Sequence, residues 1–167
     1  MKEILKIKSK IFYGLRGIGN NYTKLKCPVF ITPSDLKLKN DVEKFIYVDS
    51  NNKENTIRSI YEYVKRKVVV IDNKNWQFPY ETLHKLHGNI IDLNNLFVSI
   101  VKIFIPNIRI FTGVGVTKNN IRTSCSIVLD SENIVEEIYY FTDLIQIENL
   151  EYIFDNRMCY EILEVKK

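Results

Sequence analysis

The fold class is decided by residues 92–116, which read Asp92-Leu-Asn-Asn-Leu-Phe-Val-Ser-Ile-Val-Lys-Ile-Phe-Ile-Pro106-Asn-Ile-Arg-Ile-Phe-Thr-Gly-Val-Gly-Val116. Within this stretch the spacing of the apolar residues changes. From Leu93 to Ile105 only a narrow polar stripe interrupts them, which predicts a nearly buried helix with Asp92 as its N-cap and Pro106 as its stop. From Ile108 onward they alternate, which predicts a strand.

Downstream, the alternating pattern continues and predicts an antiparallel meander. Residues 108–116, 121–129 and 134–141 are its expected strands, and residues 118–120 and 130–133 are its turns. A short helix at 148–156 and a last strand at 158–165 are expected to complete the chain.

Upstream, residues 44–72 predict a β-α-β unit. Two apolar runs, 44–48 and 67–71, are the expected strands. Between them Ile57, Ile60, Tyr61 and Val64 are spaced as on one face of a helix. Asn51 with Glu54 is the expected capping pair of this helix. A shorter helix is expected from Pro79 to His87, closed by Gly88.

At the N-terminal end, residues 4–13 and 22–27 both alternate, and we expect them to pair as a hairpin. The whole pattern predicts one α+β domain, with a mostly antiparallel sheet, one β-α-β crossover and three or four helices packed on it. Its expected parts are the basic hairpin and an extended segment (1–43), the β-α-β unit with two helices (44–107) and the meander with a terminal helix and strand (108–167).

The composition indicates the source and the compartment. The chain has no alanine but 24 isoleucines, 18 lysines and 17 asparagines, which indicates an AT-rich genome such as that of a low-GC bacterium, a phage or a virus. Neither a signal peptide nor a membrane span is expected, because no uncharged apolar run is long enough. Three widely spaced cysteines fit neither a zinc site nor a disulfide framework. We therefore expect a cytoplasmic protein without a bound metal and without a membrane partner.

The charges are distributed unevenly along the chain. Residues 1–39 hold nine basic residues against two acids, and residues 123–167 hold three against ten. The expected hairpin would gather a basic set: Lys6, Lys8, Lys10, Arg16, Lys24 and Lys26. This set can be a solvated edge, can bind phosphates of a nucleic acid, or can pair with the acidic C-terminal region. The same asymmetry allows head-to-tail self-association of two copies.

Two glycine clusters have alternative explanations. The segment Gly14-Leu-Arg-Gly-Ile-Gly19 is expected to be a hairpin turn, with anion binding by its amides as the alternative. Gly113 and Gly115 alternate within an expected strand. We expect them to allow close packing of the helix at 93–105, with a ligand groove as the alternative.

Two pairs of residues are the candidates for catalysis. Asp49 and Asp72 each follow an expected parallel strand, so both would lie at the carboxyl edge of the sheet, where two carboxylates can hold Mg²⁺. Capping or loop roles explain them as well. His84 and His87 are three residues apart on an expected helix, a spacing that can place two imidazoles on one metal, although no third ligand is evident.

Three functional classes follow. The favoured hypothesis is a non-enzymatic binding or accessory protein of a macromolecular assembly, which can contact nucleic acid through the basic hairpin. The second is a small Mg²⁺-dependent enzyme acting on phosphate-containing substrates through Asp49 and Asp72. The third is an inhibitor or immunity-type protein that covers a basic target with its acidic C-terminal third.

Overall fold

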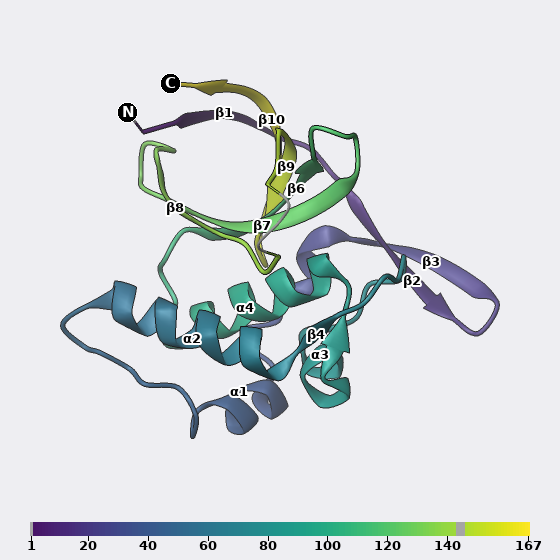
Figure 1. The fold of residues 1–167 in the computed structure, drawn as a ribbon, viewed down its shortest axis with the longest axis vertical. Coiled ribbons are helices and arrows are strands. Elements are labelled where there is room, and N and C mark those ends of the chain that lie inside the picture. Colours follow the sequence, from purple (N-terminus) through teal and green to yellow (C-terminus); the bar gives the residue numbers. More distant parts are fainter. Residues whose placement is uncertain (1, 143–145) are drawn as a thin grey trace.

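The segment that decides the fold forms a buried helix followed by a strand. In the computed structural model, which describes residues 2–142 and 146–167, helix α4 spans Ile90–Phe104 and strand β6 spans Ile110–Val116. Four helices lie in a layer under a curled, six-stranded antiparallel sheet (Figure 1), which confirms the α+β class. Helix α4 lies directly beneath the sheet because it is apolar on almost every side: its buried residues run from Ile91 to Lys102 without a break.

The sheet curls until its two edges meet. Its strands are, in order across the sheet, β1 (Ile4–Ser9), β10 (Cys159–Lys166), β9 (Asn149–Phe154), β6, β7 (Arg122–Leu129) and β8 (Val135–Tyr139). The edges β1 and β8 are joined by two backbone hydrogen bonds, from Leu5 N to Asn133 O (2.9 Å) and from Val135 N to Glu3 O (2.8 Å). Such closure leaves little unpaired edge.

Strand alternation divides the apolar residues between two cores. On the face toward the helices, Val114, Val128 and Phe154 pack with α4 in the larger core. On the inner face of the curl, Phe111 and Ile127 pack in a second, smaller core. Strands β6, β7, β9 and β10 therefore contribute side chains to two separate apolar clusters.

The helices pack as the apolar spacing predicts. Helix α2 (Lys53–Lys67) buries Ile57, Ile60 and Val64, and Asn52 caps it one residue later than expected. Helices α1 (Leu36–Val42) and α3 (Pro79–Lys85) complete the layer, together with the short 3-10 helix η1 (Cys27–Phe30). None of the helices in residues 2–142 and 146–167 combines the length and the apolar character that crossing a bilayer requires.

The β-α-β unit lies further along the chain than predicted. Residues 44–48 form no strand; they connect α1 to α2, and Phe45, Tyr47 and Val48 are at least half exposed. The one parallel pair joins β4 (Val69–Val70) to β5 (His87–Gly88), with α3 between them. An apolar run of four to eight residues is ambiguous by itself, and here no neighbouring strand was present to pair with residues 44–48.

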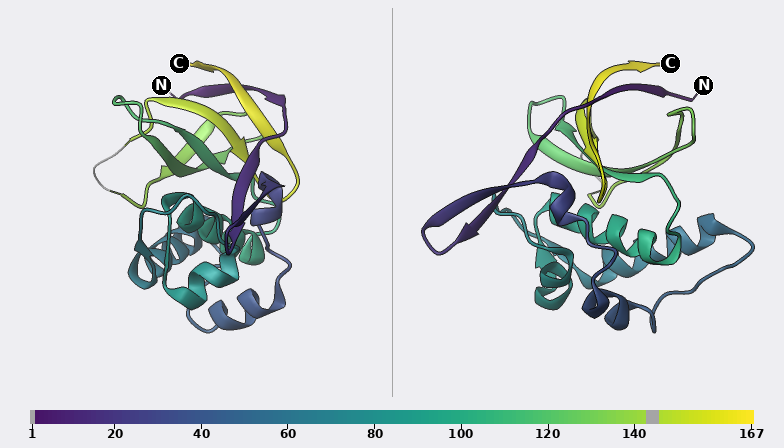
Figure 2. Two further views of the ribbon diagram at one scale, coloured as in Figure 1. Left: turned by 90° about the vertical axis from the view of Figure 1, so that its right-hand side faces the viewer. Right: turned by 180° about the vertical axis from the view of Figure 1, so that it is seen from behind.

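The N-terminal pairing also differs from the prediction. Strands β2 (Tyr13–Ile18) and β3 (Asn21–Lys26) form the hairpin, which extends away from the body of the molecule (Figure 2). Strand β1 pairs instead with β10, placing Lys6 opposite Glu164 and Lys8 opposite Glu161. Opposite charges across strands are favourable, whereas the predicted pairing would have faced lysines with lysines.

Two further expectations are corrected by the sheet. Residues 148–156 do not form a helix: strand β9 occupies 149–154, with Tyr152 and Phe154 in the core against α4 and Ile153 on the opposite face. Gly115 does allow close packing, but of β9 rather than of the helix, because a Cβ there would collide with the carbonyl oxygen of Asn149. The alternation of Tyr152, Ile153 and Phe154 was the signal for a strand.

Of the glycines at 14–19, one alone occupies the turn. Gly19 has a φ of 61°, the left-handed region that favours glycine. Gly14 lies within β2, where the Trp76 and Phe30 rings leave no room for a Cβ. The segment is therefore mostly strand, and the hairpin turn is restricted to its last residue and Asn20.

Candidate functional site

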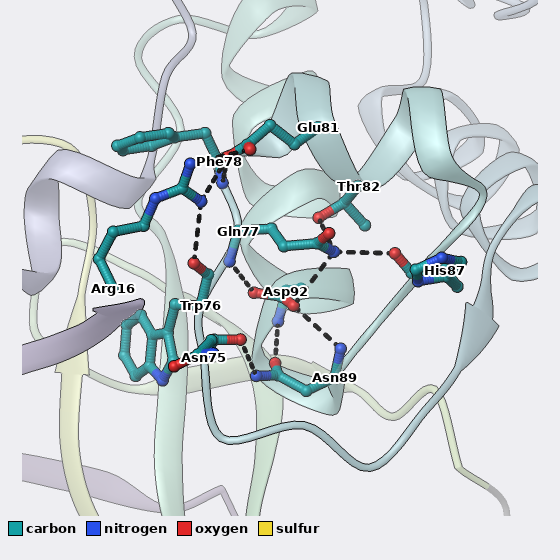
Figure 3. Close-up of polar contacts among 10 residues, drawn as sticks. All are labelled: Arg16, Asn75, Trp76, Gln77, Phe78, Glu81, Thr82, His87, Asn89 and Asp92. Atoms are coloured by element: carbon teal, nitrogen blue, oxygen red, sulfur yellow. Dashed lines mark hydrogen bonds and ion pairs between the residues drawn. The ribbon is translucent and has the colours of Figure 1, made fainter. Parts of the chain in front are cut away.

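The segment 72–78 is fastened to the start of α4 by a network of buried polar groups (Figure 3). Asp92 accepts hydrogen bonds from Gln77 N (2.8 Å) and Asn89 N (2.9 Å). Asn89, the N-cap of α4, accepts from Asp92 N and donates through Nδ2 to the carbonyl oxygens of Asn73 (2.9 Å) and Asn75 (3.1 Å). Asn89 and Asp92 form a capping box, so the N-cap of the helix lies three residues before the one predicted at Asp92.

Burial raises the pKa of Asp92 to about 6, although the amide donors of Gln77 and Asn89 act in the opposite direction. A carboxyl group whose pKa is higher in the folded than in the unfolded chain stabilises the fold most when it is protonated. This contribution is complete below the ordinary value of 3.8 and is lost as the pH rises through about 6.

We expect this carboxyl group to give a measurable pH dependence of stability. Between about pH 4 and pH 6 the contribution of Asp92 to the free energy of unfolding should fall as the pH rises. The Asp92→Asn variant keeps one oxygen acceptor but cannot titrate, so it does not gain this contribution when the pH is lowered. The free energy of unfolding of the wild type, relative to that of the variant, should therefore increase on acidification. Urea unfolding of both proteins at pH 4.5, 5.5 and 7 measures the difference. Parallel pH profiles would contradict the assignment.

The other side of the segment 72–78 is held by the hairpin. Trp76 N donates to Leu15 O (2.8 Å), and Arg16 donates to the carbonyl oxygen of Trp76 (3.2 Å). Arg16 also pairs with both carboxylate oxygens of Glu81, at 2.6 and 2.8 Å. Glu81 is partly desolvated, which opposes its ionisation, but the Arg16 guanidinium holds its pKa below the ordinary value. The segment is therefore fixed from two directions and forms a rigid wall.

A groove of about 500 Å³ lies along this wall. One end is formed by the first turn of α4, with Ile90 and Ile91, and the other by β4 and the residues that follow it, with Val70 and Asp72. The remaining lining residues come from the wall, from β7 and from the end of β8: Ile71, Asn73, Lys74, Trp76, Asn89, Arg122, Thr123 and Thr142. The hydroxyl of Thr142 has no hydrogen-bond partner within the described residues.

Among the residues that the structure describes, β4 pairs only with β5, and its Val70 lines the groove. Val69 N donates to Leu86 O (3.0 Å) and Ile71 N donates to Gly88 O (2.8 Å), so both of these amides bond toward β5. In such a ladder the peptide groups of the residue between them, Val70, face away from the partner strand. Val69 is 65% exposed and Val70 is 37% exposed. A free, apolar strand edge is a site at which an extended peptide can add.

The surface around the groove carries mixed charge. Asp72 and Lys74 lie at its rim, and Arg122 forms an ion pair with Glu151 (3.4 Å). A second hollow of about 700 Å³ lies on the other side of residues 72–75 and is lined by Leu15 and Tyr22 of the hairpin. The two hollows share the same rigid wall, so an elongated ligand can contact both.

The structure does not bring Asp49 and Asp72 together. Asp49 accepts hydrogen bonds from Asn51 N (3.0 Å) and Asn55 Nδ2 (3.0 Å), just before α2 begins. These bonds lower its pKa, and they are capping interactions. Asp72 follows the other end of α2, which has 15 residues and so spans about 22 Å. The expected shared Mg²⁺ site depended on a strand at 44–48, which does not form.

The two histidines do not share a helix face either. His84 lies in α3 beside Tyr80, with ring centroids 6.0 Å apart. The helix ends at Lys85, and Leu86 takes a left-handed conformation (φ 62°), so His87 starts β5. Within residues 2–142 and 146–167 no group of three or more histidine, cysteine or acidic side chains is placed to hold a metal.

The basic set is divided among three strands and the segment that follows β1. Lys6 and Lys8 lie on β1 opposite glutamates of β10, and Lys10 pairs with Glu161 (3.5 Å). Arg16 is occupied by Glu81, and Lys24 and Lys26 lie exposed on β3. The expected cluster on one hairpin face is therefore not formed, and the strand that carries Lys6 and Lys8 lies next to the acidic C-terminal strand.

The cysteines lie away from the groove and from the histidines. Cys125 lies in the inner core of the sheet, where burial raises its pKa to about 12. Cys27 and Cys159 lie at the start of η1 and of β10.

Sequence reasoning did not identify the groove. The wall of the groove is held by Asn89 and Gln77, two uncharged polar residues. The strand edge beside it is the side of β4 that does not pair with β5, and the sequence does not indicate which side that is. The spacing of Asn89 and Asp92 was a capping-box signal that would have moved the helix start to its observed place.

Comparison with known proteins gives one structural similarity. No protein-family model matches the chain, and no curated protein matches it in sequence. The fold is similar to the crystal structure of "a Putative Cysteine Protease from Cytophaga hutchinsonii", with a TM-score of 0.55 and 12% identity, over 98% of this chain and 76% of that chain. At this identity the likeness concerns the fold.

This similarity corrects the functional hypothesis drawn from the sequence. A non-enzymatic accessory protein of a macromolecular assembly was expected, with nucleic-acid contact through a basic hairpin. The chain instead shares its fold, over almost its full length, with a protein described as a protease, so the non-enzymatic hypothesis is not retained. The hypothesis drawn from the sequence rested mainly on the absence of a catalytic motif, and such an absence does not exclude an enzyme.

Proposed function

We propose that this chain acts on polypeptide substrates, which it binds in extended form along β4 in the groove at the start of α4. The observation that carries the proposal is the free edge of β4 beside a groove with a rigid wall. A polypeptide is the ligand whose own amide and carbonyl groups match such an edge. The fold similarity to a protein described as a cysteine protease supports the same substrate class.

The start of α4 supplies the electrostatic part of such a site. Ile90 and Ile91 are the first two residues of the helix, and their amides have no acceptor within it. The positive end of the helix therefore points to the groove and favours a carbonyl oxygen or a developing negative charge there. The nucleophile is not assigned to a cysteine, because the described cysteines lie outside the groove. We further propose that the protein works in the cytoplasm, where its three free thiols would stay reduced.

A proline substitution tests the role of the strand edge. Val70→Pro removes the amide hydrogen that faces the groove while leaving the hydrogen bonds of Val69 and Ile71 to β5, because extended backbone tolerates proline at an edge. We expect affinity for a bound peptide to fall about tenfold or more, with the melting temperature nearly unchanged. The probe is the strongest binder from an array of unstructured twelve-residue peptides, measured by fluorescence anisotropy.

The matched control is Val70→Thr, which keeps both the amide hydrogen and a β-branched side chain. Its affinity should remain within about threefold of the wild type. The same peptide, prepared with a fluorophore and a quencher at its ends, reports cleavage in the same samples. Equal affinity of Val70→Pro and Val70→Thr would exclude addition of the peptide to β4.

A further inference from the structure

A third hollow, which shares no lining residue with the groove, is lined by a cysteine and by basic residues. It has a volume of about 310 Å³ and lies where the start of β10 meets residues 9–12 and η1. The residues that matter for its chemistry are Lys10, Lys26, Arg157 and Cys159. Cys159 lines the hollow, and 9% of the residue is exposed. The thiolate is the reactive form of cysteine.

Cys159 has a second cysteine as its hydrogen-bond partner. The Cys27 thiol donates to the Cys159 sulfur and lowers the pKa of Cys159; burial opposes this, and the amides of Phe12 and Tyr160 reinforce it. The same contact with Cys159, together with burial, raises the pKa of Cys27. The backbone holds both residues against residues 10–12, since Cys27 N donates to Phe12 O (3.0 Å) and Lys10 N donates to Cys159 O (3.1 Å).

We propose that Cys159 and Cys27 form a reactive dithiol that a hydroperoxide converts to a disulfide. This site is independent of the polypeptide groove. It combines a cysteine that lines a hollow with a fully buried cysteine in the same apolar cluster, and both are bonded through their backbone to residues 10–12, which suits an attacking cysteine and a resolving cysteine. The third cysteine, Cys125, lies in the inner core of the sheet and cannot take part.

The chemistry balances in two steps. The Cys159 thiolate attacks one peroxide oxygen, so an S–O bond forms, the O–O bond breaks, and the leaving hydroxide takes up a proton to give water. The Cys27 sulfur then attacks the resulting sulfenic acid, so the S–S bond forms and the S–O bond breaks. The departing hydroxide leaves as water with the Cys27 proton. Two thiols have lost two electrons, and hydrogen peroxide has been reduced to two molecules of water.

The test is oxidation of the full chain with hydrogen peroxide. After treatment and denaturation, the number of thiols that react with Ellman's reagent should fall from three to one, and dithiothreitol should restore it. Mass spectrometry of a protease digest should show the peptide of Cys27 joined to that of Cys159. The disulfide closes a loop that includes most of the chain, so the melting temperature should rise by about 5 °C or more. The Cys125→Ser variant should form the same disulfide.

Two further measurements test the reactivity of Cys159 separately. In Cys27→Ser, peroxide should stop at a sulfenic acid on Cys159 that dimedone captures. Because that variant can fail to fold, the wild type is also treated with limiting iodoacetamide at pH 7, where Cys159 should react at least about tenfold faster than Cys125. Retention of all three thiols in peroxide, a disulfide that includes Cys125, or equal alkylation of Cys159 and Cys125 would each overturn the proposal.

Discussion

Replacement of Phe97 by alanine is expected to lower the free energy of unfolding by about 3–5 kcal/mol. Phe97 is fully buried in α4, and its ring lies 5.1 Å from Tyr139, 5.5 Å from Phe141 and 5.9 Å from Tyr61. It thus joins α4 to α2 and to the edge strand of the sheet. Its loss would remove these aromatic contacts and leave a cavity that three elements would have to close.

Phe45→Ala is the matched control. The same atoms are deleted, but Phe45 is 61% exposed and stacks on a single aromatic ring, that of Tyr63 at 6.1 Å. We expect a loss of less than about 1 kcal/mol. Urea unfolding followed by circular dichroism compares the two variants with the wild type. A cost below about 1.5 kcal/mol for Phe97→Ala would mean that the junction of α2, α4 and β8 is not packed as described.

The second large effect is expected for Asp92→Ala. The substitution leaves the amides of Gln77 and Asn89 without their acceptor inside the protein, and each unpaired buried group costs about 1–3 kcal/mol. We expect a total loss of about 2–4 kcal/mol, since the two costs share one cavity and do not add fully. Release of the segment 72–78 should also weaken peptide binding in the groove by about tenfold.

A second capping aspartate, Asp35, provides a control that separates the loss of stability from the loss of peptide binding. Asp35 caps α1, where it accepts from the amides of Lys37 and Leu38 at the surface. Asp35→Ala should cost about 1 kcal/mol and leave peptide binding unchanged. Chemical unfolding and anisotropy with the array-selected peptide measure both quantities. If Asp92→Ala binds the peptide as tightly as Asp35→Ala, the wall at 72–78 does not shape the groove.

The sequence predicted those elements whose signal is local and long. The apolar faces of α2 and α4 and the alternating residues of β6, β7 and β10 were located to within three residues. Two short apolar runs were assigned wrongly: 44–48 was predicted to be a strand and forms none, whereas 149–154 was predicted to be helical and forms β9. The two runs differ mainly in that β9 has neighbouring strands to pair with. The pairing of β1 with β10 depends on two segments at opposite ends of the sequence, which no local pattern connects.

The site residues show the same limit. The predicted pair Asp49 and Asp72 rested on a strand that does not form, so a single misassigned element removed the site. The groove, in contrast, is made by backbone edges and by capping groups such as Asn89, whose residue types also occur in ordinary loops. The contact between Cys27 and Cys159 joins η1 to β10, and cysteine spacing alone does not reveal such a contact.

The position of β1 between β8 and β10 has a consequence for how the chain folds during synthesis. Both neighbours of β1 are made late, since Ile4 bridges to Ile134 and Leu5 pairs with Val165. At about 5–20 residues per second, β1 would wait for roughly 8–30 seconds on the ribosome before its last partner is made. During that time its lysines at alternate positions would keep an unpaired apolar strand from pairing with other nascent chains.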